Sequence, residues 1–369
     1  MRVALLHYWI VTWRGGERVL KAIADLFPDA DIYAHVVDEA LVQRELPGRS
    51  VRTTFINRLP RARRYYQAYL PMMPTALEQL DLRKYDLVIS SESGPAKGVI
   101  VSPGACHVCY CHSPMRYIWD MYHDYAQGRG KLTRALMAPM FHYVRMWDQL
   151  SAQRVDHYVA NSHFVAQRIQ KYYRRPSTVI HPPVAVSDFE VSRESDDFYL
   201  SVGQLVPYKR PDLMVEAFNR LGKPLVIIGD GAMLAALRKR AGPNVRIAGP
   251  QPFEVIKRHY ARCRALVFPG VEDFGMVPVE AMASGKPVVC LGRGGALETV
   301  IDGVTGVLFE EQTVGCLVDA IRRFEAQSYG FDASAIRARA EQFSEAIFKR
   351  NFKAFVERAL TEAGRPSDP

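Results

Sequence analysis

The chain has 369 residues, 48% of them hydrophobic, and a formal net charge of +9. This length exceeds one ordinary domain, so two domains of about 180 residues, each with a full core, are expected. The absence of any long apolar run argues against a spanning helix, and no nucleic-acid-binding motif accompanies the positive charge. An N-terminal segment too short for a signal peptide predicts a cytoplasmic location.

The first half of the chain alternates strand and helix patterns. Apolar periodicity predicts a helix at 16–26, a second at 162–172 with Ser162 as its N-cap, and a long helical stretch at 133–154 that Pro139 interrupts. The stiff segment from His181 to Pro183 fits an interdomain linker. Short buried strands are expected at 3–6, 31–34, 87–90, 99–102, 108–111, 155–160 and 177–180.

Arginines and aromatic residues gather in one part of this half. No acidic residue occurs between Leu46 and Leu77. Two interpretations remain open, a solvated basic face or an interfacial segment that meets anionic lipid headgroups. The basic and aromatic residues are Arg49, Arg52, Arg58, Arg61, Arg63, Arg64, Tyr65, Tyr66 and Tyr69.

Three cysteines stand just before His112. Cys106, Cys109 and Cys111 are potential zinc ligands. They lie in an apolar strand pattern, however, and no second cysteine pair follows, which favours reduced core thiols. No convincing Asp-x-Asp metal signature occurs either, so no metal site is predicted.

The second half repeats the alternation of strands and helices. Strands are expected at 199–202, 225–228, 245–248, 265–268 and 287–291, and helices at 210–221, 232–241, 253–263 and 276–284. This order predicts a doubly wound parallel sheet in each half, with ligands beyond the carboxyl ends of the strands. A last helix is expected at 344–361, before a frayed tail at 364–369.

The segment from Glu272 to Glu280 carries the strongest functional signal. Pro278 suits a first helical turn, which places the helix start near Met276, after a buried strand. The N–H groups of such a start bind anions, and Gly275 lets a ligand approach the backbone. Glu272 in the loop and Glu280 in the first turn suit the hydroxyls of a sugar and a ribose.

Other charged and small residues follow predicted strands. Lys209 lies in the loop after the strand at 199–202, where it offers a point charge for a diphosphate, although a solvated lysine is the simpler interpretation. Gly15 and Gly16 follow the first strand and allow close approach of a phosphate. His112 directly follows the strand at 108–111. It could contact a sugar hydroxyl, or it could be a core or capping histidine with a purely structural role.

These motifs, in this order, closely resemble the donor site of retaining GT-B glycosyltransferases of family 4. The sequence from His112 to Asp120 is similar to that of bacterial mannosyltransferases that build O-antigen and exopolysaccharide repeats. The resemblance rests on Gly15-Gly16, His112–Arg116, Val202–Arg210, Gly229–Gly231, Glu272–Glu280, Gly294–Glu298 and Asp302–Gly306.

The resemblance implies an α/β chain of GT-B architecture, with two doubly wound Rossmann-like domains and a cleft between them. An acceptor-side domain would span 1–182 and a nucleotide-sugar-binding domain 183–345. Residues 346–369 would form a helix that crosses back to the first domain, and a tail.

The resemblance also assigns roles to individual residues. His112, Lys209 and Glu272 would be catalytic, with Glu272 on the donor sugar and Glu280 on the ribose. Gln204 stands where many relatives have arginine, which puts the usual Arg–Lys phosphate pair in doubt. Donor binding would use Gly15, Gly16, Gln204, Lys209, Arg210, Gly229, Gly231, Pro250, Phe274, Gly275, Met276, Val277 and Glu280.

The expected activity is metal-independent, retaining transfer of a hexose, most simply mannose from GDP-mannose, to a polyprenyl-diphosphate-linked glycan. No cofactor beyond the nucleotide-sugar is expected. The protein would contact the inner face of an anionic cell membrane peripherally. Two alternatives remain, a sugar-nucleotide epimerase of the same fold and a non-catalytic nucleotide-binding scaffold. The acceptor and the oligomeric state stay open.

Overall fold

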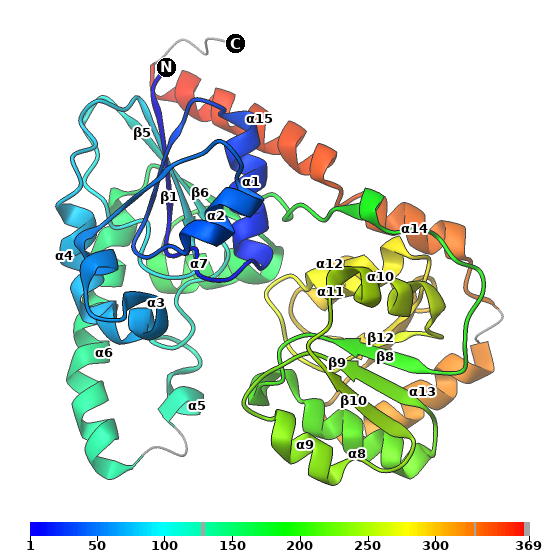
Figure 1. The fold of residues 1–369 in the computed structure, drawn as a ribbon. Helices are drawn as coiled ribbons and strands as arrows, with labels where there is room; N and C mark the ends of the chain where they lie inside the picture. Colours follow the sequence, from blue (N-terminus) through cyan, green and yellow to red (C-terminus); the bar gives the residue numbers. More distant parts are fainter. Residues whose placement is uncertain (127–129, 328–329, 365–369) are drawn as a thin grey trace. The chain divides into compact units, whose positions relative to one another are not determined.

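The computed structural model describes residues 1–126, 130–327 and 330–364, and the chain divides into two compact units (Figure 1). The first unit is Met1–His181 together with the chain from Phe348, and the second is Pro182–Ile347. The tail expected at 364–369 lies, from residue 365 on, outside the described residues.

The first unit is built on a seven-stranded parallel sheet of order β3-β2-β1-β4-β5-β6-β7. The chain places β2 and β3 on one side of β1 and then crosses to β4 on the other side, so the strand order reverses between β1 and β4. The strands are β1 (Val3–His7), β2 (Asp31–Ala34), β3 (Val51–Thr53), β4 (Leu87–Glu92), β5 (Cys106–Cys111), β6 (His157–Ala160) and β7 (Thr178–Val179).

Helices cover this sheet, and one of them comes from the far end of the chain. Phe348, Phe352 and Phe355 of α15 share a buried cluster with α1 and the strands, so this last helix completes the core of the first unit. Ser162 caps α7, because its Oγ accepts a hydrogen bond from Val165 N at 3.0 Å. The helices are α1 (Gly15–Leu26), α2 (Glu39–Glu45), α3 (Ala62–Tyr65), α4 (Met73–Glu78), α5 (Tyr122–Ala126), α6 (Lys131–Ser151), α7 (His163–Tyr173) and α15 (Glu345–Glu362).

Two expectations for this unit are wrong. Residues 99–102 form no strand, because Val99 is buried while Ile100 is 57% exposed and the segment has no ladder partner among the described strands. Pro139 does not interrupt the long helix, since α6 runs continuously through it. Pro139 lies on the exposed side, where a carbonyl that loses its helical bond can reach water.

The cysteine cluster belongs to the sheet. Cys106, Cys109 and Cys111 are all buried in β5. Burial raises the pKa of Cys111 well above its ordinary value, so its thiol stays protonated. Within the described residues, no helix is both long enough and apolar enough to cross a membrane.

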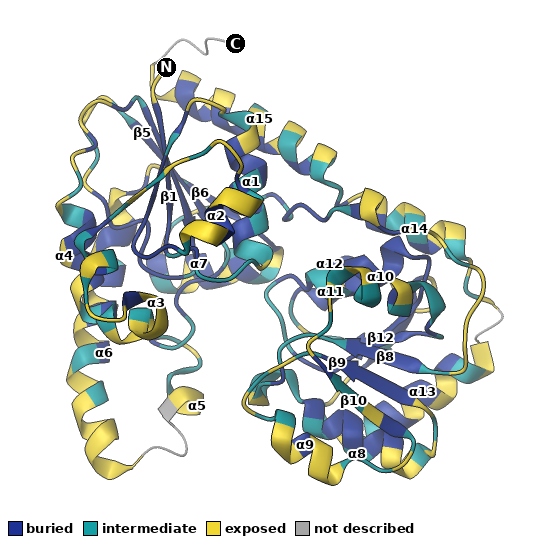
Figure 2. Ribbon diagram, viewed as in Figure 1, coloured by how far each residue is buried: buried dark blue, intermediate teal, exposed yellow. Residues whose placement is uncertain are grey.

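The second unit is built on a six-stranded parallel sheet of order β10-β9-β8-β11-β12-β13. One buried cluster joins the sheet to α10, α11 and α14, and another joins it to α8, α9 and α13, so both faces are covered (Figure 2). The strands are β8 (Tyr199–Val202), β9 (Leu225–Ile228), β10 (Val245–Gly249), β11 (Leu266–Phe268), β12 (Val288–Leu291) and β13 (Gly306–Phe309). The helices are α8 (Pro211–Leu221), α9 (Leu234–Arg240), α10 (Phe253–Arg262), α11 (Met276–Ala283), α12 (Ala296–Thr299), α13 (Val314–Gln327) and α14 (Ala333–Glu341).

Candidate functional site

The strand order of the second unit reverses at one point, between β8 and β11. The chain builds β8, β9 and β10 outward on one side and then returns to start β11 beside β8. The loops after β8 and β11 therefore diverge at the carboxyl edge of the sheet. Open parallel sheets bind ligands at such a switch point.

The two charged residues predicted for this site meet at the switch point. Lys209 ends a short 3-10 turn after β8, and Glu272 lies in the loop after β11. Lys209 Nζ lies 2.9 Å from Glu272 Oε1, and each side chain keeps about a fifth of its surface exposed, 21% and 20%. A partly shielded ammonium held in place by a carboxylate can receive a diphosphate, while the carboxylate can accept hydrogen bonds from sugar hydroxyls.

Main-chain contacts between loops form the floor beside this pair. Gly203 N donates to Ile228 O at 3.0 Å, and Leu205 N donates to Asp230 O at 2.9 Å, which ties the loops after β8 and β9 together. Gly229 has φ of 152°, and a Cβ there would lie 1.8 Å from Gly203 O. Only glycine fits this approach. Gly231 lies in the same loop, and the exposed Pro250 follows β10.

The helix start predicted at Met276 is present. Gly275 precedes it with φ of 86°, in the left-handed region that favours glycine. Phe274 is buried against Phe343, with ring centroids 5.4 Å apart, and fixes the approach to the helix. The start of α11, with Val277 in its first turn, lies after β11 at the carboxyl edge of the sheet, where its dipole favours an anion.

Glu280 lies deeper than expected. It is the fifth residue of α11, so its placement in the first helical turn is wrong, and only 7% of its surface is exposed. Tyr260 of α10 donates its hydroxyl to Glu280 Oε2 at 3.0 Å. This bond orients the carboxylate from a residue far away in the sequence, which no local pattern revealed.

Gln204 and Arg210 flank the lysine differently. Arg210 is held by its own helix, with Nη2 donating to Asp212 Oδ2 at 3.1 Å and Nε donating to Asp212 Oδ1 at 3.2 Å. Its guanidinium is thus directed along α8. Gln204 is partly exposed in the loop after β8.

In the first unit, His112 lies in a chain of hydrogen bonds beside that unit's own switch point. Ser91, in β4, lies 3.1 Å through its Oγ from His7 Nδ1 and 2.8 Å from His112 Nε2. Burial, with a smaller contribution from His7, lowers the pKa of His112 to about 3, so the ring is neutral near pH 7. Ser91 was missed because the strand was expected to end at residue 90, whereas β4 continues to Glu92.

Gly15 and Gly16 are the first two residues of α1, which begins one residue before the start expected at residue 16. A Cβ on Gly16 would lie 2.4 Å from the hydroxyl of Tyr8, so a larger residue would collide there. Glu17, almost fully buried, accepts a hydrogen bond from Arg14 N at 2.9 Å and lies 4.0 Å from His7 Nε2.

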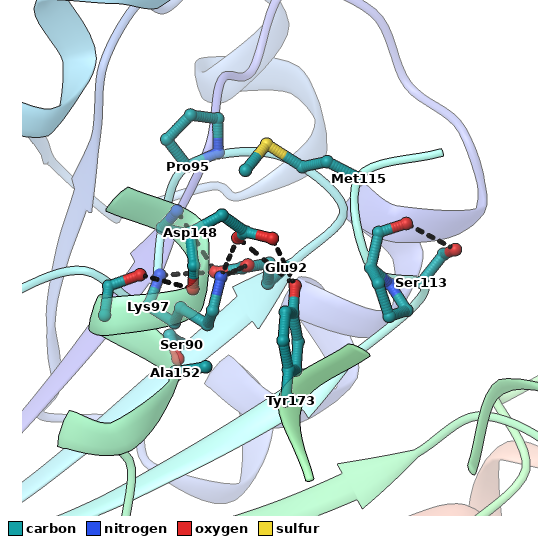
Figure 3. Close-up of polar contacts among 12 residues, drawn as sticks. Ser90, Glu92, Pro95, Lys97, Ser113, Met115, Asp148, Ala152 and Tyr173 are labelled. Atoms are coloured by element: carbon teal, nitrogen blue, oxygen red, sulfur yellow. Dashed lines mark hydrogen bonds and ion pairs between the residues drawn. The ribbon is translucent and has the colours of Figure 1, made fainter. Parts of the chain in front are cut away.

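A buried ion cluster supports this edge of the first unit (Figure 3). Lys97 Nζ donates a hydrogen bond to Glu92 Oε1 at 2.6 Å and forms a second ion pair with Asp148 of α6. All three side chains are fully buried. Tyr173 of α7 adds a hydrogen bond to Asp148 at 3.0 Å. Because His112 N donates to Glu92 O at 2.7 Å, the cluster also fixes the backbone of the histidine.

Two arginines of the basic segment have close partners within their own unit. Arg49 donates to Ala24 O at 2.6 Å and Phe27 O at 2.9 Å, and Arg52 pairs with Asp31 at 3.3 Å, so both serve the unit itself. Four other arginines of the segment are exposed and form what we call the exposed basic patch: Arg58, Arg61, Arg63 and Arg64.

Two family models match consecutive parts of the chain. A "Glycosyltransferase Family 4" model matches residues 13–188, and a "Glycosyl transferases group 1" model matches residues 186–348. An uncharacterized glycosyltransferase of Methanocaldococcus jannaschii is 30% identical over 172 residues, 45% of this chain and 48% of that protein. D-inositol 3-phosphate glycosyltransferase of Mycolicibacterium smegmatis is 27% identical over 241 residues, 58% of this chain and 56% of that protein. The chain thus spans about half the length of the curated relatives it matches.

Solved structures match over nearly the whole chain. HepE of Anabaena, crystallised with UDP, has a TM-score of 0.73 at 19% identity and covers 97% of this chain and 100% of its own. Sucrose-phosphate synthase of Thermosynechococcus elongatus has a TM-score of 0.73 at 16% identity. The match covers 98% of this chain and 100% of the synthase chain. At these identities the likeness shows the fold, which is GT-B with two Rossmann-like sheets.

Proposed function

We propose that this chain, a family 4 glycosyltransferase of GT-B fold, transfers a hexose from a nucleotide-sugar to a lipid-linked glycan with retention of anomeric configuration. The resemblance of the segment from His112 to Asp120 favours mannose from GDP-mannose and an acceptor on a polyprenyl diphosphate. A uridine donor is the second candidate, because HepE, of the same fold, was crystallised with UDP and with UDP-glucose.

The Lys209–Glu272 pair at the switch point of the second unit carries this proposal. Departure of the nucleoside diphosphate builds up negative charge on its phosphate oxygens. Lys209 and the N-terminus of α11 are fixed before the reaction, so they stabilise that charge without reorganising. Protein groups supply the positive charge in this account, and no step passes through a metal. Glu272 would hold the sugar, and Glu280, oriented by Tyr260, the ribose.

The first unit would supply the acceptor side. His112 is neutral and held by Ser91, so it can exchange a hydrogen bond with a sugar hydroxyl without carrying charge. The exposed basic patch would bring the protein peripherally to the anionic inner face of the cell membrane, where a lipid-linked acceptor resides.

The lysine can be tested by substitution. Lys209→Ala should lower the transfer rate on the order of 10²-fold or more, as expected for the loss of one preorganised charge. Lys223→Ala is the matched control, because Lys223 also forms a carboxylate pair in this unit, with Glu325 at 2.8 Å, but lies in the turn between α8 and β9. Equal transfer rates for the two variants would show that Lys209 has no role in the reaction.

The donor and the metal requirement can be measured together. Thermal shifts with GDP-, UDP-, ADP- and TDP-sugars should show one preferred base, since ligand at 100 times its dissociation constant stabilises by about 2.7 kcal/mol. Transfer should persist in excess EDTA, and complete loss that magnesium restores would contradict the donor-site account. Turnover of the donor without any acceptor would indicate the epimerase, and donor binding without turnover the scaffold.

A further inference from the structure

The long helix α6 of the first unit carries an apolar stripe on its exposed side. At 3.6 residues per turn, positions alternately four and three residues apart fall on one line along a helix. Leu132, Leu136 and Leu150 are 75%, 67% and 67% exposed, which is unusual for leucine. We define the stripe as Leu132, Leu136, Pro139, Tyr143, Met146 and Leu150, all of them exposed.

The stripe is not the face by which α6 packs on its own unit. Phe141, Val144 and Trp147 perform that role, in a buried cluster with the segment that contains α3 and α4. The helix therefore has two apolar faces, one buried and one open. From Leu132 to Leu150 the open face extends over about 27 Å, at about 1.5 Å per residue. Contiguous exposed apolar patches are candidates for binding surfaces.

The exposed charged residues of α6 itself have one sign. Lys131 and Arg134 are exposed at the start of α6, and its only carboxylate, Asp148, is buried in the ion cluster with Lys97. The exposed basic patch lies on the segment that packs against the buried face of α6, because Ile56 and Ala62 of that segment share the cluster with Phe141. The apolar stripe is thus accompanied by exposed cationic residues on the same unit.

We propose that α6 docks the first unit onto an anionic lipid bilayer, with its apolar stripe in the interfacial region and the neighbouring basic residues at the headgroups. An apolar face beside Lys and Arg residues is the pattern of a helix that lies in the membrane plane. A second copy of the chain fits less well, because paired helices are held by charges of both signs beside the seam, and α6 exposes cations alone. The inference deepens the membrane contact named in the proposed function and rests on it.

Vesicle binding by the full chain tests the stripe. The probe is a vesicle of phosphatidylglycerol and phosphatidylcholine, assayed by co-sedimentation at low and at physiological salt. Leu132→Ser with Leu136→Ser should weaken binding about 10- to 100-fold at both salt concentrations, because each leucine would lose its burial in the interface. Ile100→Ser with Val191→Ser is the control, since both residues are exposed apolar residues outside α6, and it should bind as the unchanged protein does.

A second variant separates the basic patch from the stripe. Arg61, Arg63 and Arg64 changed together to Ser should weaken the salt-sensitive part of vesicle binding and leave the salt-resistant part, since salt screens exposed charges but not apolar burial. All variants should keep the thermal midpoint and the nucleotide affinity of the unchanged protein, because every changed residue is exposed.

Unaltered vesicle binding by the leucine variant would overturn the inference. So would a lipid-free dimer that the two leucine substitutions dissociate while vesicle binding persists, because the stripe would then join two copies. The readout is independent of transfer. A chain that binds vesicles through α6 but glycosylates only soluble acceptors overturns the proposed acceptor and leaves the docking helix in place.

Discussion

Two buried histidines of the first unit, His35 and His107, are held without charge. His35 is 1% exposed, with Nδ1 bonded to Thr54 Oγ1 and Nε2 to Pro95 O, each at 3.0 Å. A neutral ring satisfies both contacts by accepting at Nδ1 and donating at Nε2. Burial lowers the pKa of His35 to about 4 and that of His107 to about 4.

This gives a prediction for pH dependence. In the unfolded chain, a histidine ring titrates near pH 6.5. Below that pH the unfolded chain therefore binds more protons than the folded chain does. The free energy of unfolding that the neutral buried ring contributes is complete above about pH 6.5 and declines as the pH falls toward 4. The free energy of unfolding should fall between pH 7.5 and pH 5 in both proteins. The fall should be about 2 kcal/mol smaller in His35→Gln than in the unchanged protein. Urea denaturation at both pH values measures this.

The matched control for this prediction is His142→Gln. His142 is exposed on α6, so its replacement should leave the pH dependence of stability as it is in the unchanged protein. If His35→Gln also retains the full dependence, proton uptake by the unfolded His35 is not a source of acid destabilisation.

At the scale of elements, the loops of the second unit depend on a close backbone approach. A side chain on Gly229 would collide with Gly203 O and separate the loops after β8 and β9. Gly229→Ala should therefore cost several kcal/mol of stability, or abolish nucleotide binding if the loops move apart instead. Calorimetry with and without nucleotide distinguishes the two results.

A second glycine of the same unit provides the control. Gly315 lies in α13 with nothing within 4 Å of a Cβ built on it. Gly315→Ala should leave stability unchanged or raise it by up to about 1 kcal/mol, because alanine favours a helix. Equal stability and nucleotide affinity in both variants would contradict the role given to the loop contact.

Strands with a strong local pattern were predicted correctly. Those at 31–34 and 225–228 have their expected bounds. Val51–Thr53 was missed, since this edge strand is only partly buried and its arginine obscures the pattern. The segment at 99–102 was mistaken for a strand because Val99 and Ile100 are apolar, although only one of them is buried.

The charged part of the candidate site was visible in the sequence, but its supports were not. Lys209 and Glu272 each follow a recognisable strand, and strand order alone predicts that such loops meet at the switch point. Tyr260, which orients Glu280, lies on a different helix. Ser91 joins His7 to His112 only because β1, β4 and β5 lie side by side. Contacts between distant segments leave no local periodicity to detect.

At the scale of the whole molecule, α15 ties the stability of the first unit to the far end of the chain. Phe352 is fully buried and stacks on Phe348, with ring centroids 5.5 Å apart. Phe352→Ala should destabilise the first unit by about 3–5 kcal/mol. Lys353→Ala, at an exposed position of the same helix, should change stability by no more than about 0.5 kcal/mol.

Hydrogen exchange resolved by segment measures where the loss falls. Amides of β4 and β5 should exchange faster in Phe352→Ala, while those of β9 and β11 in the second unit should keep their protection. Equal loss in both units, or loss confined to the second, would show that α15 does not belong energetically to the first.

The place of α15 also sets an order of events during translation. The ribosome finishes the second unit before it makes the residues that close the core of the first. At about 5–20 residues per second, the nascent first unit waits about 10–30 s with the apolar surface around Tyr110 open, because Phe348 and Phe352 pack there. The half of the protein that is synthesised first is therefore the half that matures last.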